Sequence, residues 1–330
     1  MDTLSIIKEK ARQKRRRVVL PEGTEPRVIM AAKKIVSDRL AGVTLLGDPA
    51  EITRLAGEHG LDLSTVEVIN PTESPDFEGY AADFMKLREK KGITEDEARA
   101  TVARPLYFGA MLVRHDRVDA SVAGSVNTTG DVLRAGIQVI GLKEGINTVS
   151  SFFMMMVPEY GGEQNRVFFY ADGAVVPNPT AEQLVSITVS TAESMRNLLG
   201  REPKIAMLSF STKGSAQHDD VTKVVTAFEM LKKEHPELKV DGELQVDAAI
   251  VPEIAAKKSP GSPVGGEADI LIFPDLDAGN IAYKLTQRLA KATATGPIIQ
   301  GLAKPANDLS RGCSAEDIVD VTAIAVLMKG

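Results

Sequence analysis

Three stretches of the sequence combine small hydroxyl residues, glycine and basic residues, a combination that can bind an anion such as phosphate. They cover residues 124–134 (GSVNTTGDVLR), 209–216 (SFSTKGSA) and 307–317 (NDLSRGCSAED). Glycine lets main-chain N–H groups approach an anion, hydroxyls add donors, and a following helix N-terminus adds partial positive charge. The first two stretches are also explained by a capped turn and a serine-rich turn that bind no ligand.

The third stretch carries the strongest signal. Ser314 fits a helix N-cap and Asp317 the third helical position, a capping box that accounts for both residues structurally. It does not account for Ser310 and Arg311 just before the cap, where a hydroxyl and a guanidinium face whatever the helix N-terminus faces. Arg134, in the first turn after the first stretch, is placed to bind a phosphate with its planar fork of donors.

Other kinds of site are excluded or disfavoured. No two glycines are separated by a single residue, so the G-x-G-x-x-G dinucleotide motif is absent, and the sequence contains no P-loop, H-E-x-x-H or G-x-S-x-G. The single cysteine, Cys313, excludes an intrachain disulfide and a cysteine-cluster metal site, and fits a reducing cytoplasm. We therefore expect no metal and no tightly bound cofactor.

The composition also argues against two classes of partner, nucleic acids and membranes. The formal net charge of -6 argues against a general nucleic-acid binder, and no apolar run approaches the roughly 20 residues of a membrane helix. We expect a cytoplasmic protein that binds neither nucleic acid nor a membrane.

Short apolar runs alternate with helix-period segments along the chain, which predicts an α/β fold with mainly parallel sheets covered by helices. The expected strands are 17–20, 43–46, 66–69, 118–123, 149–157, 166–170, 204–209, 269–273 and 297–300. The expected helices are 27–40, 51–59, 77–90, 94–115, 131–140, 181–199, 219–235, 248–257, 280–293 and 315–328. Thr94 is expected to cap the helix that follows it.

The 330 residues exceed the size at which a single core stops growing, so we expect two three-layer α/β/α domains. The loop 141–145 joins the two halves, and the last helix is expected to return to the first domain. This predicts a discontinuous first domain, 1–146 plus 300–330, and a second domain, 147–299. A chain that crosses twice places an active site in the cleft between the domains.

Several segments resemble the phosphate acetyltransferase family, in its short single-module form. The match is specific and spans nearly the whole chain. The matching segments are 303–314 (AKPANDLSRGCS), 208–216 (LSFSTKGSA), 241–249 (DGELQVDAA), 273–285 (FPDLDAGNIAYKL) and 128–134 (TTGDVLR). The resemblance implies two α/β domains, usually a homodimer, and reversible conversion of acetyl phosphate and coenzyme A into acetyl-CoA and inorganic phosphate, with coenzyme A as a substrate.

The resemblance also implies roles for individual residues. Asp317 resembles the general base that takes the thiol proton, and Ser310 the group that hydrogen-bonds near the reacting acyl centre. Arg311 and Arg134 resemble the cations that hold the phosphoryl group, and Arg88 another ligand-binding arginine. Free thiol and aspartate side chains differ by about 4–5 pKa units, so full proton transfer costs roughly 6 kcal/mol unless desolvation or nearby arginines narrow the difference.

The two other loops supply further candidate substrate-binding hydroxyls. These are Ser125, Thr128, Thr129, Ser211 and Thr212.

Three alternatives stay open. A phosphate butyryltransferase-like enzyme would have a larger acyl pocket, and a non-catalytic acyl-CoA-sensing module would share the fold without the reaction. A dehydrogenase on a related two-domain architecture is disfavoured by the missing dinucleotide motif.

Overall fold

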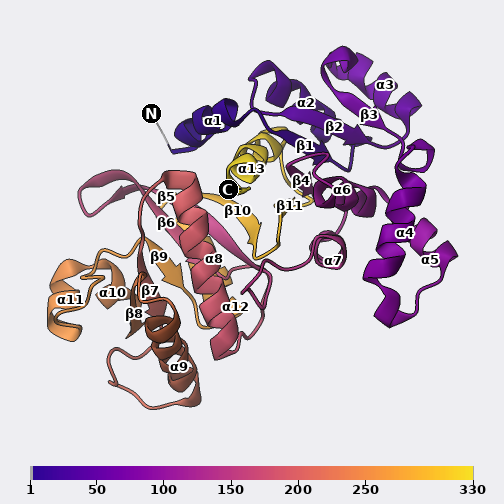
Figure 1. The fold of residues 1–330 in the computed structure, drawn as a ribbon. Helices are drawn as coiled ribbons and strands as arrows, with labels where there is room; N and C mark the ends of the chain where they lie inside the picture. Colours follow the sequence, from indigo (N-terminus) through magenta and orange to yellow (C-terminus); the bar gives the residue numbers. More distant parts are fainter. Residues whose placement is uncertain (1–2, 330) are drawn as a thin grey trace. The chain divides into compact units, whose positions relative to one another are not determined.

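The computed structural model describes residues 3–329, which divide into two compact units (Figure 1). The first unit comprises residues 3–143 together with 302–329, and the second comprises residues 144–301. Each has its own hydrophobic core and its own sheet.

The sheet of the first unit has five strands in the order β11-β4-β1-β2-β3, and all neighbouring pairs are parallel. Its strands are β1 (Arg17–Leu20), β2 (Gly42–Leu46), β3 (Glu67–Ile69), β4 (Ala120–Ala123) and β11 (Ala306–Asp308). The short strand β11 was not predicted, because three residues are too few to show a period. It brings a segment from the end of the chain beside β4, so that Asp308 lies opposite Ala123.

Helices cover this sheet in two groups. Helices α1, α2, α3 and α13 pack on one another, and α4, α5, α6 and α7 form the other group. Their bounds are α1 (Thr3–Lys14), α2 (Pro26–Ser37), α3 (Pro49–His59), α4 (Phe77–Leu87), α5 (Glu95–Val102), α6 (Pro105–Arg114), α7 (Thr129–Val139) and α13 (Ala315–Met328), with 3-10 turns at Leu63–Thr65, Pro71–Glu73 and Glu89–Lys91. Helix α13 is buried along most of its length, and its first turn is the part that is exposed.

The single helix predicted at 94–115 is wrong, because the segment forms two helices, α5 and α6. Arg104, between them, has an extended conformation with ψ 129°. Pro105 causes the break, since proline disfavours the helical conformation in the residue before it and cannot donate a main-chain hydrogen bond. Thr94 caps α5, as predicted, and Glu97 completes a capping box with it.

The second unit has a six-stranded mixed sheet in the order β10-β5-β6-β9-β7-β8. Its strands are β5 (Ser150–Tyr160), β6 (Glu163–Ala171), β7 (Lys204–Leu208), β8 (Lys239–Leu244), β9 (Ile270–Ile272) and β10 (Thr293–Gln300). Its helices are α8 (Ala181–Leu199), α9 (Asp219–Glu234), α10 (Val246–Ile250), α11 (Pro252–Lys258) and α12 (Leu276–Leu289). The α/β class with mainly parallel sheets is confirmed.

Two pairings in this sheet are antiparallel, which the strand–helix rhythm did not predict. Strands β5 and β6 form a hairpin, and β10 pairs with the other edge of β5. Gly161 and Gly162 join the hairpin with φ values of 60° and 81°, the left-handed conformations that a tight hairpin turn requires. The polar strand β8 was missed, and the helix predicted at 248–257 is two short helices broken at Pro252.

Candidate active site

Two of the three stretches singled out in the sequence lie side by side in the first unit. Strands β4 and β11 are parallel neighbours, and the Leu309 N–H donates to the Ala123 carbonyl at 2.8 Å. The loops 124–128 and 309–314 therefore leave the same edge of the sheet, where parallel α/β folds bind their ligands.

The predicted capping box at the start of α13 is present. Oδ2 of Asp317 accepts hydrogen bonds from the Ser314 N–H (2.8 Å) and the Ser314 hydroxyl (2.9 Å), and the Asp317 N–H donates back to Ser314 Oγ. Oδ1 of Asp317 makes no hydrogen bond with the described residues, and the side chain is exposed. One oxygen thus holds the helix, while the other is available to receive a proton.

Ser310 and Arg311 are both exposed immediately before this cap. Oγ of Ser310 accepts a hydrogen bond from the Gly312 N–H at 3.2 Å, which leaves the hydroxyl proton free to donate to a ligand. The Arg311 guanidinium makes no ion pair with the described residues, whereas its main-chain carbonyl is held from behind.

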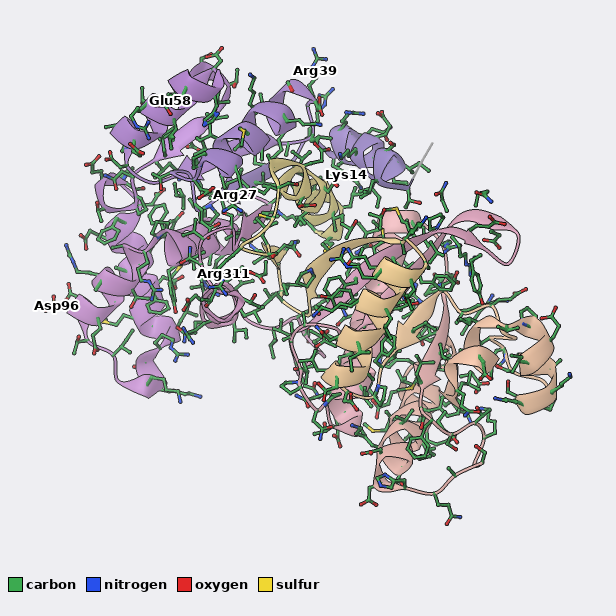
Figure 2. The ribbon with its side chains drawn as sticks, turned by 180° about the vertical axis from the view of Figure 1, so that it is seen from behind. Lys14, Arg27, Arg39, Glu58, Asp96 and Arg311 are labelled. Atoms are coloured by element: carbon green, nitrogen blue, oxygen red, sulfur yellow. The ribbon has the colours of Figure 1, made fainter. Side chains whose placement is uncertain are left out.

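The main-chain carbonyl of Arg311 is bound by Arg27, a residue that the sequence analysis did not identify. The guanidinium donates to the carbonyls of Arg311 and Cys313, both at 2.8 Å, and to the carbonyl of Ser125 at 2.9 Å. Figure 2 labels Arg27 and Arg311 near one another in this unit. One side chain thus connects the two loops through their main chains.

The 124–128 loop binds an anion from the chain itself, the carboxylate of Glu22. The side chain is 8% exposed and accepts main-chain hydrogen bonds from residues 124–127 and side-chain hydrogen bonds from Ser125 and Asn127. Burial acts to raise the pKa of Glu22, but these hydrogen bonds outweigh it and lower the pKa below its usual value. Glu22 was also missed; its only signal is its place two residues after the end of a strand.

The three candidate hydroxyls at residues 125, 128 and 129 each donate a hydrogen bond to a carboxylate. Ser125 donates to Glu22, Thr128 to Asp131 at 2.8 Å and Thr129 to Asp308 at 2.6 Å. Substrate binding by these three hydroxyls stays a prediction, since each has a structural partner in the chain.

The guanidinium of Arg104 lies over the ring of Tyr107, and the charges of Arg134 and Arg88 also act on this tyrosine. The Arg104 guanidinium lies 5.2 Å from the centre of the Tyr107 ring, and burial raises the pKa of Tyr107 against the opposing charges of Arg104, Arg134 and Arg88. Arg134 is exposed and pairs with Asp131 at 2.8 Å. The charges of Arg134 and Arg88, and of Arg104, which was not predicted, thus all act on Tyr107, while binding of a substrate phosphate by Arg134 and Arg88 stays a prediction.

Asp308, the last residue of β11, has a buried carboxylate with a raised pKa. It is 1% exposed, and its Oδ1 has no hydrogen-bond partner among the described residues. Burial raises the pKa of Asp308 to about 6, with the hydrogen bond from Thr129 opposing it and the charge of Glu22 adding to it. Gly124 is required beside it, because a Cβ there would lie 2.4 Å from Asp308 Oδ1.

We expect Asp308→Asn to remove a pH-dependent destabilisation. The folded-state pKa is above the unfolded value of 3.8, so the contribution of Asp308 to stability is greatest below pH 4 and is lost as pH rises to about 6. The loss is roughly 3 kcal/mol at about 1.36 kcal/mol per pKa unit. Denaturant unfolding should be measured from pH 4 to 8. The free energy of unfolding of the variant should rise relative to that of the wild type up to about pH 6, and the difference should stay constant above that pH. A difference independent of pH would contradict the assignment.

The remaining stretch, residues 209–216, lies in the second unit and binds another internal carboxylate, that of Glu243. Oε1 of Glu243 accepts from the Ser211 hydroxyl and the Gly214 N–H, both at 2.8 Å. Oγ1 of Thr212 accepts from the Gln245 N–H at 2.9 Å. Ser211 and Thr212 are buried, and their predicted contact with substrate stays a prediction.

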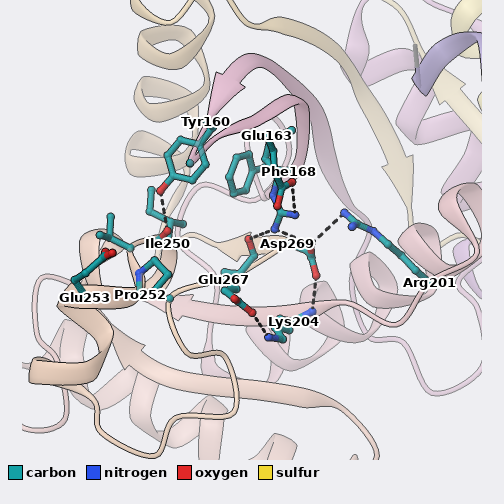
Figure 3. A pocket seen from close by; sticks show the side chains of 15 residues that line it. Tyr160, Glu163, Phe168, Arg201, Lys204, Ile250, Pro252, Glu253, Glu267 and Asp269 are labelled. Atoms are coloured by element: carbon teal, nitrogen blue, oxygen red, sulfur yellow. Dashed lines mark hydrogen bonds and ion pairs between the residues drawn. The ribbon is translucent and has the colours of Figure 1, made fainter. Parts of the chain in front are cut away.

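The second unit also contains a polar cavity of about 640 Å³ (Figure 3). Its central group, Asp269, pairs with Arg166 and Arg201, both at 3.0 Å, and accepts from the Lys204 N–H. The cavity lies where β7 and β9 begin, the opposite end from the one that binds ligands in parallel sheets. None of the predicted site residues lines it, and its basic side chains are neutralised, so we do not assign it to the substrates.

Within residues 3–329, no group of three or more histidine, cysteine, aspartate or glutamate side chains is arranged to hold a metal ion. No helix in the described part of the chain has the length and apolar character needed to cross a membrane.

Comparison with known proteins identifies the family. A family model described as phosphate acetyl/butaryl transferase matches residues 2–326. The chain is 51% identical over 323 residues to the phosphate acetyltransferase of Thermoanaerobacterium thermosaccharolyticum, covering 98% of each chain. It is 50% identical over 327 residues to that of Clostridium acetobutylicum, covering 99% of this chain and 98% of the relative.

A solved structure agrees with the sequence matches. The crystal structure of a phosphotransacetylase from Streptococcus pyogenes has a TM-score of 0.93 at 40% identity, covering 99% of this chain and 98% of that chain. The family predicted from the sequence is confirmed: the chain belongs to the phosphate acetyl/butaryl transferase family.

Proposed function

We propose that this chain transfers an acetyl group reversibly between acetyl phosphate and coenzyme A. The observation that carries the proposal is the exposed trio at the start of α13, formed by the hydroxyl of Ser310, the guanidinium of Arg311 and the carboxylate of Asp317. The relatives named phosphate acetyltransferase support the choice of acetyl group.

The reaction needs these three groups. The coenzyme A sulfur attacks the acetyl carbonyl carbon, the new C–S bond forms, and the bond between that carbon and the phosphate oxygen breaks. Asp317 takes the thiol proton, because the thiolate is the nucleophile. Ser310 donates to the carbonyl oxygen as it gains negative charge. Arg311 neutralises the departing phosphate, to which the proton finally passes, and Arg134 and Arg88 bind substrate phosphates nearby.

Two further features belong to the proposal. Coenzyme A is a substrate, and no tightly bound cofactor is needed because the thiol and the phosphate leaving group supply the chemistry. A cytoplasmic location is supported by the single cysteine, which suits a reducing compartment.

We also propose a homodimer, supported by an apolar stripe on α12. Ile281, Leu285 and Leu289 follow one another at four-residue spacing and are 56%, 52% and 80% exposed. A stripe of this kind is typical of a surface that a partner covers. Sedimentation equilibrium of wild type and of Leu285→Glu tests it; two monomeric proteins would contradict the dimer.

The decisive assay is thioester formation by purified protein from acetyl phosphate and coenzyme A, followed by thioester absorbance. Rapid turnover is expected. A well-folded protein that binds acyl-CoA without turnover would instead be the sensing module. Because the family description also names the butyryl reaction, propionyl and butyryl phosphate should be compared, and we expect acetyl phosphate to give the highest kcat/KM.

A further inference from the structure

Glu22 fills the site that the 124–127 loop would otherwise offer to a substrate anion. Its Oε2 accepts from the Gly124 N–H (3.0 Å), the Ser125 N–H (2.8 Å) and the Ser125 hydroxyl. Its Oε1 accepts from the Val126 N–H (3.0 Å), the Asn127 N–H (2.8 Å) and the Asn127 side-chain amide (2.8 Å). Six donors on one buried carboxylate fix four consecutive residues of the loop.

Arg27, on the same β1–α2 segment, acts on the carbonyl side of the loop. It donates to the carbonyl of Ser125, whose N–H and hydroxyl Glu22 already holds. It donates equally to the carbonyls of Arg311 and Cys313, and Glu25 orients it by accepting from Nε at 2.7 Å. The contact with Ser125 therefore joins the loop bound by Glu22 to the loop that carries the catalytic side chains.

We propose that Glu22 and Arg27 are positioning residues for acetyl transfer. Glu22 fixes the 124–127 loop, and Arg27, anchored on that loop through Ser125, holds the main chain of Arg311 and Cys313. This contact fixes the main chain that carries the exposed side chains of Ser310 and Arg311. The proposal rests on the acetyl-transfer function proposed above and adds two residues that touch no substrate.

Glu22→Ala gives a specific test, because it empties a carboxylate-shaped space and leaves its donors in place. We expect turnover to fall about 10- to 100-fold, since a displacement of about 1 Å at a reacting group can cost 10²-fold. Added formate should restore turnover saturably, because its carboxylate fits the same donors. Chloride at equal ionic strength should not restore it, and formate should not activate wild type.

Controls separate positioning from folding. Arg27→Gln should lose turnover to a similar extent. Formate should not restore it, because in this variant Glu22 still occupies the carboxylate site of the 124–127 loop. Glu58→Gln, on the exposed face of α3 in the same unit, should behave as wild type. Unchanged turnover in folded Glu22→Ala, or formate that restores the melting temperature without restoring turnover, overturns the positioning role.

Hydrogen exchange supplies a readout that does not depend on activity. Glu22→Ala should speed amide exchange at residues 124–127 and also at 309–313, which Glu22 does not touch, and formate should reverse both changes. Faster exchange confined to 124–127 overturns the coupling through Arg27. A wild type without thioester formation overturns the proposed function instead, while the exchange result still decides the coupling.

Discussion

We expect Asp317→Asn to lower the turnover of thioester formation by roughly 10²- to 10⁴-fold, the usual size of a general-base contribution. Asparagine retains an oxygen that can accept the hydrogen bonds from Ser314, so α13 keeps its cap, but its amide cannot take the thiol proton. The KM values for acetyl phosphate and coenzyme A should change little. Initial rates over a range of both substrates measure the effect.

The pH profile tests the same role independently. A free thiol titrates near pH 8.5, so above that pH coenzyme A provides its own thiolate and the deficit of Asp317→Asn should shrink. Ser314→Ala is the matched control, because it removes the cap hydroxyl but leaves the carboxylate. It should cost about 1 kcal/mol of stability and much less turnover than Asp317→Asn. Near-normal turnover of Asp317→Asn, or equal losses of turnover in both variants, would contradict the assignment of Asp317 as the general base.

Arg311→Gln should reduce kcat/KM for acetyl phosphate by roughly 10²- to 10³-fold, the loss seen when one prepositioned donor to a developing charge is removed. The exposed guanidinium makes no ion pair with the described residues, so the substitution leaves no buried carboxylate unpaired. The contact from Arg27 reaches the main-chain carbonyl and is retained in the variant. The loss should therefore come from substrate binding and transition-state charge, with the melting temperature unchanged.

Arg311→Lys provides the matched comparison, because lysine keeps the charge but loses the planar fork that binds a phosphate through two hydrogen bonds. We expect activity between those of wild type and Arg311→Gln, with a raised KM for acetyl phosphate in both variants. An effect confined to the KM for coenzyme A would place Arg311 at a different phosphate and contradict the proposed role.

Local features of the fold could be predicted because their causes are local. The cap at Thr94 and the capping box at Ser314 follow from hydroxyl residues placed at helix starts, with Asp317 three positions after Ser314, and the buried strand β5 follows from its apolar run. The errors have equally definite causes. Pro105 and Pro252 each divide a segment that was predicted as one helix. The glycine turn at 161–162 allows an antiparallel hairpin, and strand β8 was missed because its sequence contains too few apolar residues to form an apolar run.

The sequence by itself determined the α/β class, the family and the residue types of the trio in the loop before α13, because these depend on short-range pattern and specific motifs. Only the tertiary structure decided which loops meet. The pairing of β11 with β4 brings the end of the chain beside its middle, and Glu22 and Arg27 reach both loops from near its start. Such contacts depend on strand order, and no spacing along the chain specifies which carboxylate fills which group of N–H donors.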